Sequence, residues 1–297
     1  MPKLISVGEL IDRTWEKFRT WQTPLLNISA WLLLIALLNV IGLALYPTYS
    51  KLQQLSNLAL SFSEKTGVIL FIVTNYILGP LMGVWVFAAT ARYIEAKFAG
   101  QRMNVSGALR EGRKAFFPLL YIGILCIGIL IGAVLIGLSP TILLEAIRRL
   151  TGIDHVVFNM LQIFSVLLGI AGSSVLLFAW GVRYAFAPFV FLAENIRGRA
   201  ALKRSHEITR HQFWGVCIRL LVPHLIFPGI AALILFTLNF FAQFFLGTAG
   251  GLNLDLFLRL QDIVSLVLPL FVTVLINPLV ILANILIYKS LREQQKA

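Results

Sequence analysis

The stretch Ile263–Tyr288, IVSLVLPLFVTVLINPLVILANILIY, contains no Asp, Glu, Lys or Arg. A helix needs about 20 mainly apolar residues to cross a hydrocarbon core roughly 30 Å thick, so this stretch is long enough to span a membrane. Pro24–Tyr46 and Gly67–Ala91 also lack charged residues and meet the same length. These three stretches predict a helical integral membrane protein.

The composition of the whole chain agrees with this prediction. Hydrophobic residues make up 59% of the 297 positions and charged residues 13%, whereas an ordinary soluble domain is about 45–50% apolar and about 25% charged. The mean hydropathy is +0.87. A water-soluble fold is therefore excluded. The two cysteines, Cys126 and Cys217, lie in apolar runs and are too few for a disulfide framework or a cysteine zinc site.

Six membrane spans are predicted when the same criterion is applied along the chain. Their expected bounds are 24–46, 67–91, 118–139, 159–182, 214–246 and 263–288. The fifth is longer than one membrane thickness and contains Pro223 and Pro228, so we expect its first turns at the interface. The apolar piece Tyr184–Ala193 is too short to cross, and we interpret it as a helix extension or an interfacial segment.

Lys and Arg are distributed unevenly between the two sides that the six spans define. One side receives 20 of these 25 residues and the other receives 5. Because cytoplasmic loops carry the excess of Lys and Arg, we expect both termini in the cytoplasm. Acidic residues divide as 8 and 5, so the whole formal charge of +12 falls on the cytoplasmic face.

This basic face predicts membrane lipids with anionic headgroups as partners, because a Lys or Arg near such a surface gains about 1 kcal/mol. A partner membrane protein with an acidic surface is the alternative. Nucleic acid is not expected, because no Gly-rich, aromatic-interleaved or helix-turn-helix pattern accompanies the charge.

The segment 6–20, before the first span, has the pattern of an amphipathic helix that lies on the membrane surface. Ser6 and Glu9 have the spacing of a capping box, in which each side chain accepts a hydrogen bond from a backbone N–H of the first turn. Mainly apolar residues recur at helical spacing, and charged residues take the opposite face. The residues of the mainly apolar face are Val7, Leu10, Ile11, Thr14, Trp15 and Phe18.

Two features of this first third of the chain recur later. The amphipathic pattern returns at 104–116, before the third span, and at 199–212, before the fifth, where Ala201, Ser205, Ile208 and Thr209 form the face opposite the charged residues. Each even-numbered span also ends with a tyrosine beside a basic residue, at Arg92-Tyr93, Arg183-Tyr184 and Tyr288-Lys289. Such pairs are typical interfacial anchors.

The recurrence predicts an internal repeat. We expect three pseudo-repeats, at about 1–91, 92–182 and 183–288, within a single membrane domain that covers 1–297. Each repeat should hold one interfacial helix followed by a hairpin of two membrane spans. The predicted fold class is therefore all-α, a polytopic bundle of six transmembrane helices.

Several short motifs resemble a known family. The chain is similar to the six-span membrane domain that is fused to some bacterial glycerophosphodiester phosphodiesterases and that also occurs in standalone integral membrane proteins. The resemblance covers nearly the whole chain and rests on Ser6–Arg13, Ala187-Pro188-Phe189, Glu194, Ala201–Ser205, Thr209-Arg210, Phe213-Trp214, Asn277-Pro278-Leu279 and Tyr288–Arg292. It implies a six-span helical domain in a bacterial cytoplasmic membrane, and no particular activity of that domain.

The fused enzymes of this family carry a separate soluble barrel with metal-binding carboxylates and paired histidines. Such a barrel takes about 250 residues, and this sequence has no soluble stretch of that length. The resemblance therefore does not extend the hydrolase activity to this chain. We expect a protein without catalytic residues, cofactor or metal site.

The histidines and loop carboxylates also lack a catalytic or metal-binding pattern. His206 and His211 are five residues apart, so one helical face does not present both. No Ser or His stands at a recognisable catalytic spacing from the carboxylates on the outer side, which are Glu145, Asp154, Asp255 and Asp262.

Polar and helix-breaking residues inside the spans support an alternative function, a carrier for a small or lipid-like solute. Proline breaks expose backbone carbonyls that can line a ligand site, although neighbouring helices can equally satisfy such kinks. No span has an Asp or Glu in its interior, so ion coupling through a buried carboxylate is not expected. The candidate intramembrane polar site consists of Asn75, Pro80, His224, Asn277 and Pro278.

The sequence favours a non-enzymatic integral membrane protein that organises lipids or partner proteins at the cytoplasmic face. Its candidate contacts are five cations on two of the amphipathic segments: Arg110, Arg113, Lys114, Lys203 and Arg204. A membrane-embedded enzyme acting on lipid headgroups is a further alternative, suggested only by the fused enzymes of the resembled family.

The charge distribution makes a direct prediction about topology. In a variant that lacks Cys126 and Cys217, single cysteines at Ser56 and at Asp154 should react with a membrane-impermeant thiol reagent added outside intact cells. Labelling of both positions only after the membrane is permeabilised would reverse the topology, and with it the assignment of the basic face.

Overall fold

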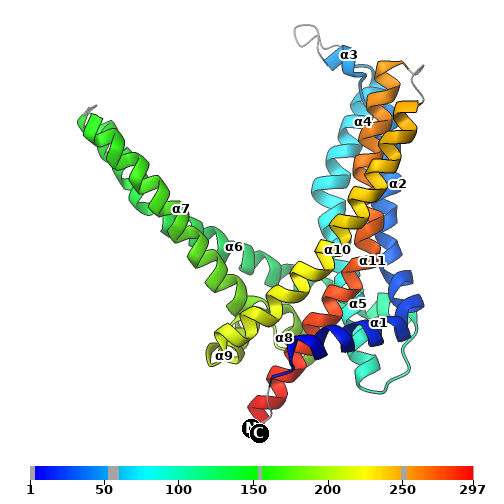
Figure 1. The fold of residues 1–297 in the computed structure, drawn as a ribbon, viewed down its shortest axis with the longest axis vertical. Coiled ribbons are helices and arrows are strands. Elements are labelled where there is room, and N and C mark those ends of the chain that lie inside the picture. Colours follow the sequence, from blue (N-terminus) through cyan, green and yellow to red (C-terminus); the bar gives the residue numbers. More distant parts are fainter. Residues whose placement is uncertain (1–3, 53–59, 153–155, 249–252, 297) are drawn as a thin grey trace. The chain divides into compact units, whose positions relative to one another are not determined.

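The protein consists of helices and the turns between them in a computed structural model that describes residues 4–52, 60–152, 156–248 and 253–296 (Figure 1). Within these ranges there is no strand. The described residues form six helical segments long and apolar enough to cross a membrane: Val7–Leu45, Phe62–Phe98, Val105–Thr151, Phe158–Glu194, Phe213–Gly247 and Leu254–Gln295. The predicted all-α membrane protein with six spans is confirmed. Ser56 and Asp154 of the labelling experiment lie outside the described residues.

The chain divides into two compact units. The larger unit comprises the described residues of 3–116 and 221–290, and the smaller unit those of 117–220 and 291–297. Three helices have residues in both units: α6 (Val105–Thr151), α10 (Phe213–Thr248) and α11 (Leu254–Lys296). This division does not test the threefold repeat, which stays a prediction.

The larger unit begins with a helix that starts at its predicted cap. α1 (Val7–Ser29) follows Ser6, whose Oγ accepts a hydrogen bond from the Glu9 N–H at 3.2 Å. The Glu9 carboxylate pairs with Arg13. The hydrogen bond that the predicted capping box assigns to the serine side chain is thus confirmed. The glutamate side chain instead forms an i, i+4 ion pair. Trp21 has non-helical torsions (φ −112°, ψ 17°), and this kink separates the amphipathic first part of α1 from the apolar remainder.

The first two spans form a helical hairpin in the larger unit, and in Figure 1 the first part of α1 runs crosswise to α2. The elements in chain order are η1 (Ala30–Leu32), α2 (Leu33–Leu45), α3 (Tyr49–Leu52), α4 (Phe62–Val73), the π-helical η3 (Thr74–Leu78) and α5 (Gly79–Phe98). α2 and α4 pack directly against each other. They approach closely because Gly67 has no side chain: a Cβ there would lie 2.6 Å from the carbonyl carbon of Leu45.

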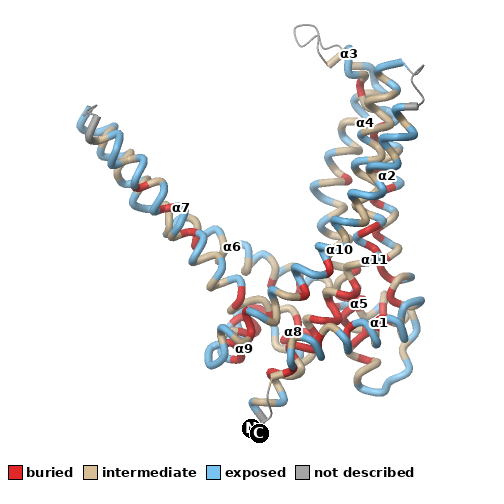
Figure 2. The backbone as a smooth tube through the Cα atoms, in the orientation of Figure 1, coloured by how far each residue is buried: buried red, intermediate tan, exposed pale blue. Residues whose placement is uncertain are grey.

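The core of the larger unit lies in α5 and in the second half of α11 (Figure 2). The start of α6 joins this core because Gly112 lets it approach α5, where a Cβ would lie 2.8 Å from Cβ of Ala89. Tyr93 and Tyr288, which the sequence suggested as interfacial anchors, are 2% and 0% exposed. Their rings are packed inside the protein, because both lie on the buried faces of α5 and α11.

The smaller unit contains α8 (Ala187–Glu194), which follows α7 (Val156–Tyr184) and corresponds to the predicted helix extension or interfacial segment. α8 is a separate helix with Pro188 in its first turn, and it ends at Asn195 in the left-handed conformation (φ 57°). Proline lacks an N–H and suits the start of a helix, so the helix restarts there. Its buried residues, Ala187, Phe189, Val190, Phe191 and Leu192, make it part of the core.

α9 (Gly198–Arg210) is the third predicted amphipathic helix, and hydrogen bonds attach it to α7. The face that the sequence places opposite the charged residues is buried within the protein, at Ala201, Ser205, Ile208 and Thr209. Ser205 Oγ donates to the carbonyl of Arg183 at 2.8 Å. That carbonyl belongs to the last turn of α7, where carbonyls lack intrahelical partners. The polar members of this face therefore help to cap α7.

All three predicted amphipathic segments, 6–20, 104–116 and 199–212, are helical over nearly their whole length, in α1, in the start of α6 and in α9. Their orientation along the membrane surface stays a prediction.

α6 extends to Thr151, beyond the predicted end of the third span at 139. Pro140 has no N–H to donate to the carbonyl of Ile136, and the hydroxyl of Ser139 donates to that carbonyl at 2.7 Å. The helix passes through the proline because a neighbouring side chain satisfies the freed backbone group.

α6 and α7 approach most closely at Gly137. A Cβ at this position would lie 2.2 Å from Oγ and 2.5 Å from the backbone nitrogen of Ser173. Ser173 Oγ in turn donates to the carbonyl of Val134 at 3.3 Å. Small residues at a helix crossing let two backbones approach and form such interhelical hydrogen bonds.

We expect Gly137→Ala to destabilise the smaller unit by about 1–3 kcal/mol, because the added methyl group forces α6 and α7 apart. Thermal unfolding of the purified protein in detergent measures the change. Gly132→Ala on the same helix is the matched control, since a Cβ there meets nothing within 4 Å. Equal melting temperatures for the two variants would contradict the close crossing.

Candidate functional site

A positively charged cavity lies in the larger unit, between the last turn of α5 and the start of α6. We call it the basic basin. Its volume is about 620 Å³, and it is lined by Lys97, Arg102, Met103, Asn104, Gly107, Arg110 and Glu111. Arg102 and Arg110 are exposed, and Lys97 is half-buried. Three cations and one carboxylate leave the basin with an excess of positive charge.

The start of α6 contributes backbone donors to the basic basin. Asn104 Oδ1 accepts a hydrogen bond from the Gly107 N–H at 2.8 Å, which is an N-cap contact. The other N–H groups of a first helical turn have no intrahelical acceptor, and the helix dipole is positive at this end. A helix start and cations in the same cavity together favour an anionic ligand.

Contacts around the basic basin show which of its cations are available to a ligand. Glu111 is 2.7 Å from Lys114, so this carboxylate is neutralised within its own helix. The Lys97 ammonium lies 5.4 Å from the centroid of the Tyr93 ring, a contact that positions it at the basin. Among the described residues, Arg102 and Arg110 form no ion pair. These two guanidinium groups are therefore available to a ligand.

Three of the five cations predicted from the sequence lie on the start of α6. Arg110 lines the basic basin. Arg113 is exposed outside it, and Lys114 is engaged with Glu111. The sequence analysis did not select Lys97 or Arg102, because they lie outside the amphipathic segment. The turn before α6 brings them to the basin.

The remaining two predicted cations, Lys203 and Arg204, lie on α9 in the smaller unit. Lys203 is exposed. Arg204 is 3.4 Å from Glu194 and 3.8 Å from Glu207, so its charge is compensated inside the protein. Ion pairing therefore makes Arg204 a weaker candidate for lipid contact than the sequence suggested.

Glu194 is the centre of an ion-pair cluster in the smaller unit. Its carboxylate, only 13% exposed, also lies 3.6 Å from Arg292. A cavity of about 440 Å³ is lined by Glu194, Arg204, Arg292 and Gln295. The carboxylate joins the end of α8 to α9 and to the last turns of α11, so we interpret the cluster as a structural connection.

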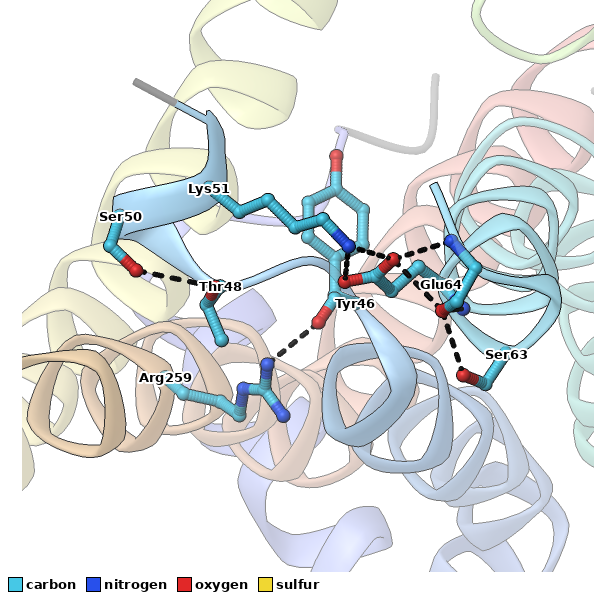
Figure 3. Close-up of polar contacts among 8 residues, drawn as sticks. Tyr46, Thr48, Ser50, Lys51, Ser63, Glu64 and Arg259 are labelled. Carbon is cyan, nitrogen blue, oxygen red and sulfur yellow. Dashed lines mark hydrogen bonds and ion pairs between the residues drawn. The ribbon is translucent and has the colours of Figure 1, made fainter. Parts of the chain in front are cut away.

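A polar cluster in the larger unit joins the ends of α2, α4 and α11 (Figure 3). The guanidinium of Arg259 donates to the carbonyls of Ala44 and Tyr46, each at 2.6 Å. Both carbonyls lie at the end of α2, where no further turn supplies donors. Arg259, from α11, therefore caps α2.

Two carboxylates complete this cluster. Asp255 accepts hydrogen bonds from the Ser50 N–H at 3.1 Å and from the Ser50 hydroxyl at 2.9 Å. Glu64 is 2.7 Å from the ammonium of Lys51 and forms a complete capping box with Ser61 at the start of α4. The sequence analysis treated Asp255 as having no serine partner, because Ser50 is 205 positions away.

A cavity of about 70 Å³ lies beside this cluster and is lined in part by Tyr46, Asp255 and Arg259. It has room for about two water molecules, each of which occupies about 30 Å³ in the liquid. The charged groups of the cluster are engaged with other parts of the protein. The arrangement fastens helix ends together and leaves little space for a substrate.

Asn75, from the predicted intramembrane site, forms a direct contact between two helices. Its Nδ2 donates to Oδ1 of Asn39 at 2.7 Å, and Nδ2 of Asn39 donates back at 3.3 Å. Asn75 Nδ2 also donates to the carbonyl of Phe71 at 2.8 Å, one turn earlier. Asn39 is only 1% exposed. The pair therefore satisfies a buried amide where the π-helical η3 begins.

The other members of the predicted intramembrane site have different surroundings. Pro80 is exposed in the first turn of α5, and His224 is exposed on α10. Asn277 is half-buried and Pro278 is buried, both within α11. None of these four residues lines the cavities described above. The carrier site stays a prediction.

Comparisons of the chain with protein-family models, curated proteins and solved structures found no significant match. The resemblance to the membrane domain of the phosphodiesterase fusions therefore stays a prediction from motifs. Within the described ranges, no three His, Cys, Asp or Glu side chains are placed to hold a metal ion. The geometry of the basic basin is consequently the basis for a proposed function.

The Asn39–Asn75 pair predicts a non-additive pattern of stabilities. Asn75→Leu should destabilise the larger unit by about 1–2 kcal/mol, because it leaves the buried amide of Asn39 without its partner. The double variant Asn39→Leu/Asn75→Leu should be less destabilised than the two single variants added together, since both polar groups are removed. Melting temperatures in detergent measure this coupling. Additive effects would show that the two amides act independently.

Proposed function

We propose that this integral membrane protein binds anionic lipid headgroups at its cytoplasmic face and thereby organises the lipids around it. The basic basin is the observation that supports the proposal, because it combines two unpaired arginines, one lysine and a helix start. A guanidinium group forms paired hydrogen bonds with phosphate oxygens, and an ammonium group contributes a compact charge. This set of groups matches a lipid phosphodiester.

The position of the basin along the helices favours a lipid over a free anion. Lys97 is near the end of α5 and Arg110 is one turn inside α6, so both stand just beyond apolar spans. Side chains in such positions extend to the headgroup region while their methylene groups cover apolar surface. The predicted topology puts this end of the spans in the leaflet that is rich in anionic lipid.

The strength of the interaction follows from the number of cations. Each Lys or Arg near an anionic surface contributes about 1 kcal/mol, so three give about 3 kcal/mol, or more than a hundredfold in affinity. The interaction is electrostatic and solvent-exposed, so it should weaken as the ionic strength rises. A hydrophobic lipid contact would not show that dependence.

Removal of the three charges should test the proposal. Lys97→Gln/Arg102→Gln/Arg110→Gln should bind phosphatidylglycerol at least about tenfold more weakly than the original protein, because the phosphate loses its ligands. Native mass spectrometry of the detergent-solubilised protein, titrated with phosphatidylglycerol at several salt concentrations, measures the bound lipid.

The matched control removes three exposed cations from α9 and its start: Arg197→Gln/Arg199→Gln/Arg210→Gln. This variant has the same net charge and the same predicted side of the membrane, but it leaves the basic basin intact. It should retain most of the binding. An equal loss in both variants would mean that only total charge matters, and no loss in either would reject the proposed site.

A further inference from the structure

A further cavity in the larger unit has the opposite character to the basic basin. It has a volume of about 400 Å³, within the roughly 300–1,000 Å³ of ligand pockets. Its walls come from α1, α10 and α11, and ten of its twelve lining residues are Ile, Leu, Phe or Trp. We call it the apolar groove. The lining residues are Ile11, Asp12, Trp15, Phe18, Gln22, Ile226, Phe227, Ile230, Ile234, Leu275, Ile276 and Leu279.

Polar groups enter the apolar groove only from α1. Asp12 and Gln22 are the lining residues with polar side chains, apart from the indole N–H of Trp15. The residues contributed by α10 and α11 are all apolar. The groove therefore has one polar border, on the amphipathic helix, and apolar walls on the two membrane-spanning helices. A phospholipid has the same division between headgroup and acyl chain.

The charges along this border are suited to a zwitterion. Asp12 is exposed and, among the described residues, forms no ion pair or hydrogen bond. Arg19, also exposed, is outside the lining of the groove but follows Asp12 by seven residues, which places both on the same stripe of the helix. Trp15 lies between them on that stripe and is 57% exposed. A carboxylate and a guanidinium two turns apart can accept an ammonium group and a phosphate group, respectively.

We propose that the apolar groove holds one acyl chain of a phospholipid whose headgroup bears a primary ammonium group, with the ammonium at Asp12 and the phosphate at Arg19. A primary ammonium donates hydrogen bonds to a carboxylate, whereas the quaternary ammonium of choline has no N–H to donate. Trp15 borders the groove at the level of the headgroup, where tryptophan rings are enriched in membrane proteins. The occupant is therefore phosphatidylethanolamine rather than phosphatidylcholine.

This site is separate from the basic basin. The two cavities share no lining residue, and they favour different headgroups. The basin has an excess of positive charge, whereas the groove has an unpaired carboxylate at its border. The groove would remain a lipid site if the basin bound no lipid, and the basin would remain one if the groove bound no lipid.

The experiment compares lipids that differ only in headgroup. The delipidated full-length chain is titrated with phosphatidylethanolamine and with phosphatidylcholine of the same acyl chains, and native mass spectrometry counts the bound lipids. The ethanolamine lipid should bind about three- to fivefold more tightly, because its ammonium N–H groups can donate hydrogen bonds to Asp12, whereas the equally charged choline group has none to donate. Asp12→Asn should abolish this preference, while Glu16→Gln, an exposed carboxylate of α1 outside the groove, should retain it.

A second pair of variants tests the groove itself. Ile230→Trp puts a large ring into the lining and should reduce binding of the ethanolamine lipid, whereas Leu233→Trp, exposed on the same helix but outside the lining, should not. Melting temperatures of both variants confirm that they fold. The proposal would be overturned if these two variants bound the ethanolamine lipid equally, or if the original protein bound both headgroups equally. It would also be overturned if the original protein were a dimer that Ile230→Trp dissociates, because a second copy would then fill the groove.

The variants of the basic basin separate this proposal from the proposed function. Lys97→Gln/Arg102→Gln/Arg110→Gln should leave binding of the ethanolamine lipid unchanged, because none of the three residues borders the groove. Loss of phosphatidylglycerol binding in Asp12→Asn would instead show that the two cavities form one site, and the assignment of the groove would then be rejected.

Discussion

Every peptide group within the hydrocarbon of a membrane needs a hydrogen-bond partner from the protein itself, and this constraint governs the structure. It explains why the described chain is helical. It also explains two local exceptions that side chains repair. The Ser139 hydroxyl satisfies the carbonyl that Pro140 leaves free, and Asn75 donates to the carbonyl of Phe71 at the π-helical turn. Helix ends follow the same rule, since Arg259 caps α2.

Polar groups in this protein therefore have two separate roles. Several of those at helix ends are engaged with other parts of the chain, as Asp255 is with Ser50 and Glu194 is with Arg204. Those on the basic basin and on the border of the apolar groove remain available to ligands. The distinction depends on pairing, because Arg204 and Arg110 have the same chemistry and only the second is unpaired. The basic basin and the apolar groove would recognise different lipid headgroups because different unpaired charges border them.

Features that depend on a short stretch of sequence were predictable. Hydrophobicity over one membrane thickness identified the six spans, and the helical spacing of Ala201, Ser205 and Ile208 grouped them on one face of α9. Contacts between distant residues were not predictable. Nothing near Asp255 in the sequence indicates Ser50, and nothing near Asn75 indicates Asn39. Of the three cations of the basic basin, the sequence analysis selected only Arg110. Lys97 and Arg102 lie near it because the chain turns between α5 and α6, and the sequence pattern did not show this.

The cap that Arg259 places on α2 has a consequence for the order of assembly during synthesis. The carbonyls of Ala44 and Tyr46 emerge from the ribosome more than 200 residues before the guanidinium that satisfies them. Until the last span is inserted, the end of the first span depends on water or lipid headgroups for its hydrogen bonds. A chain arrested before α11 is inserted therefore leaves the end of α2 without this cap.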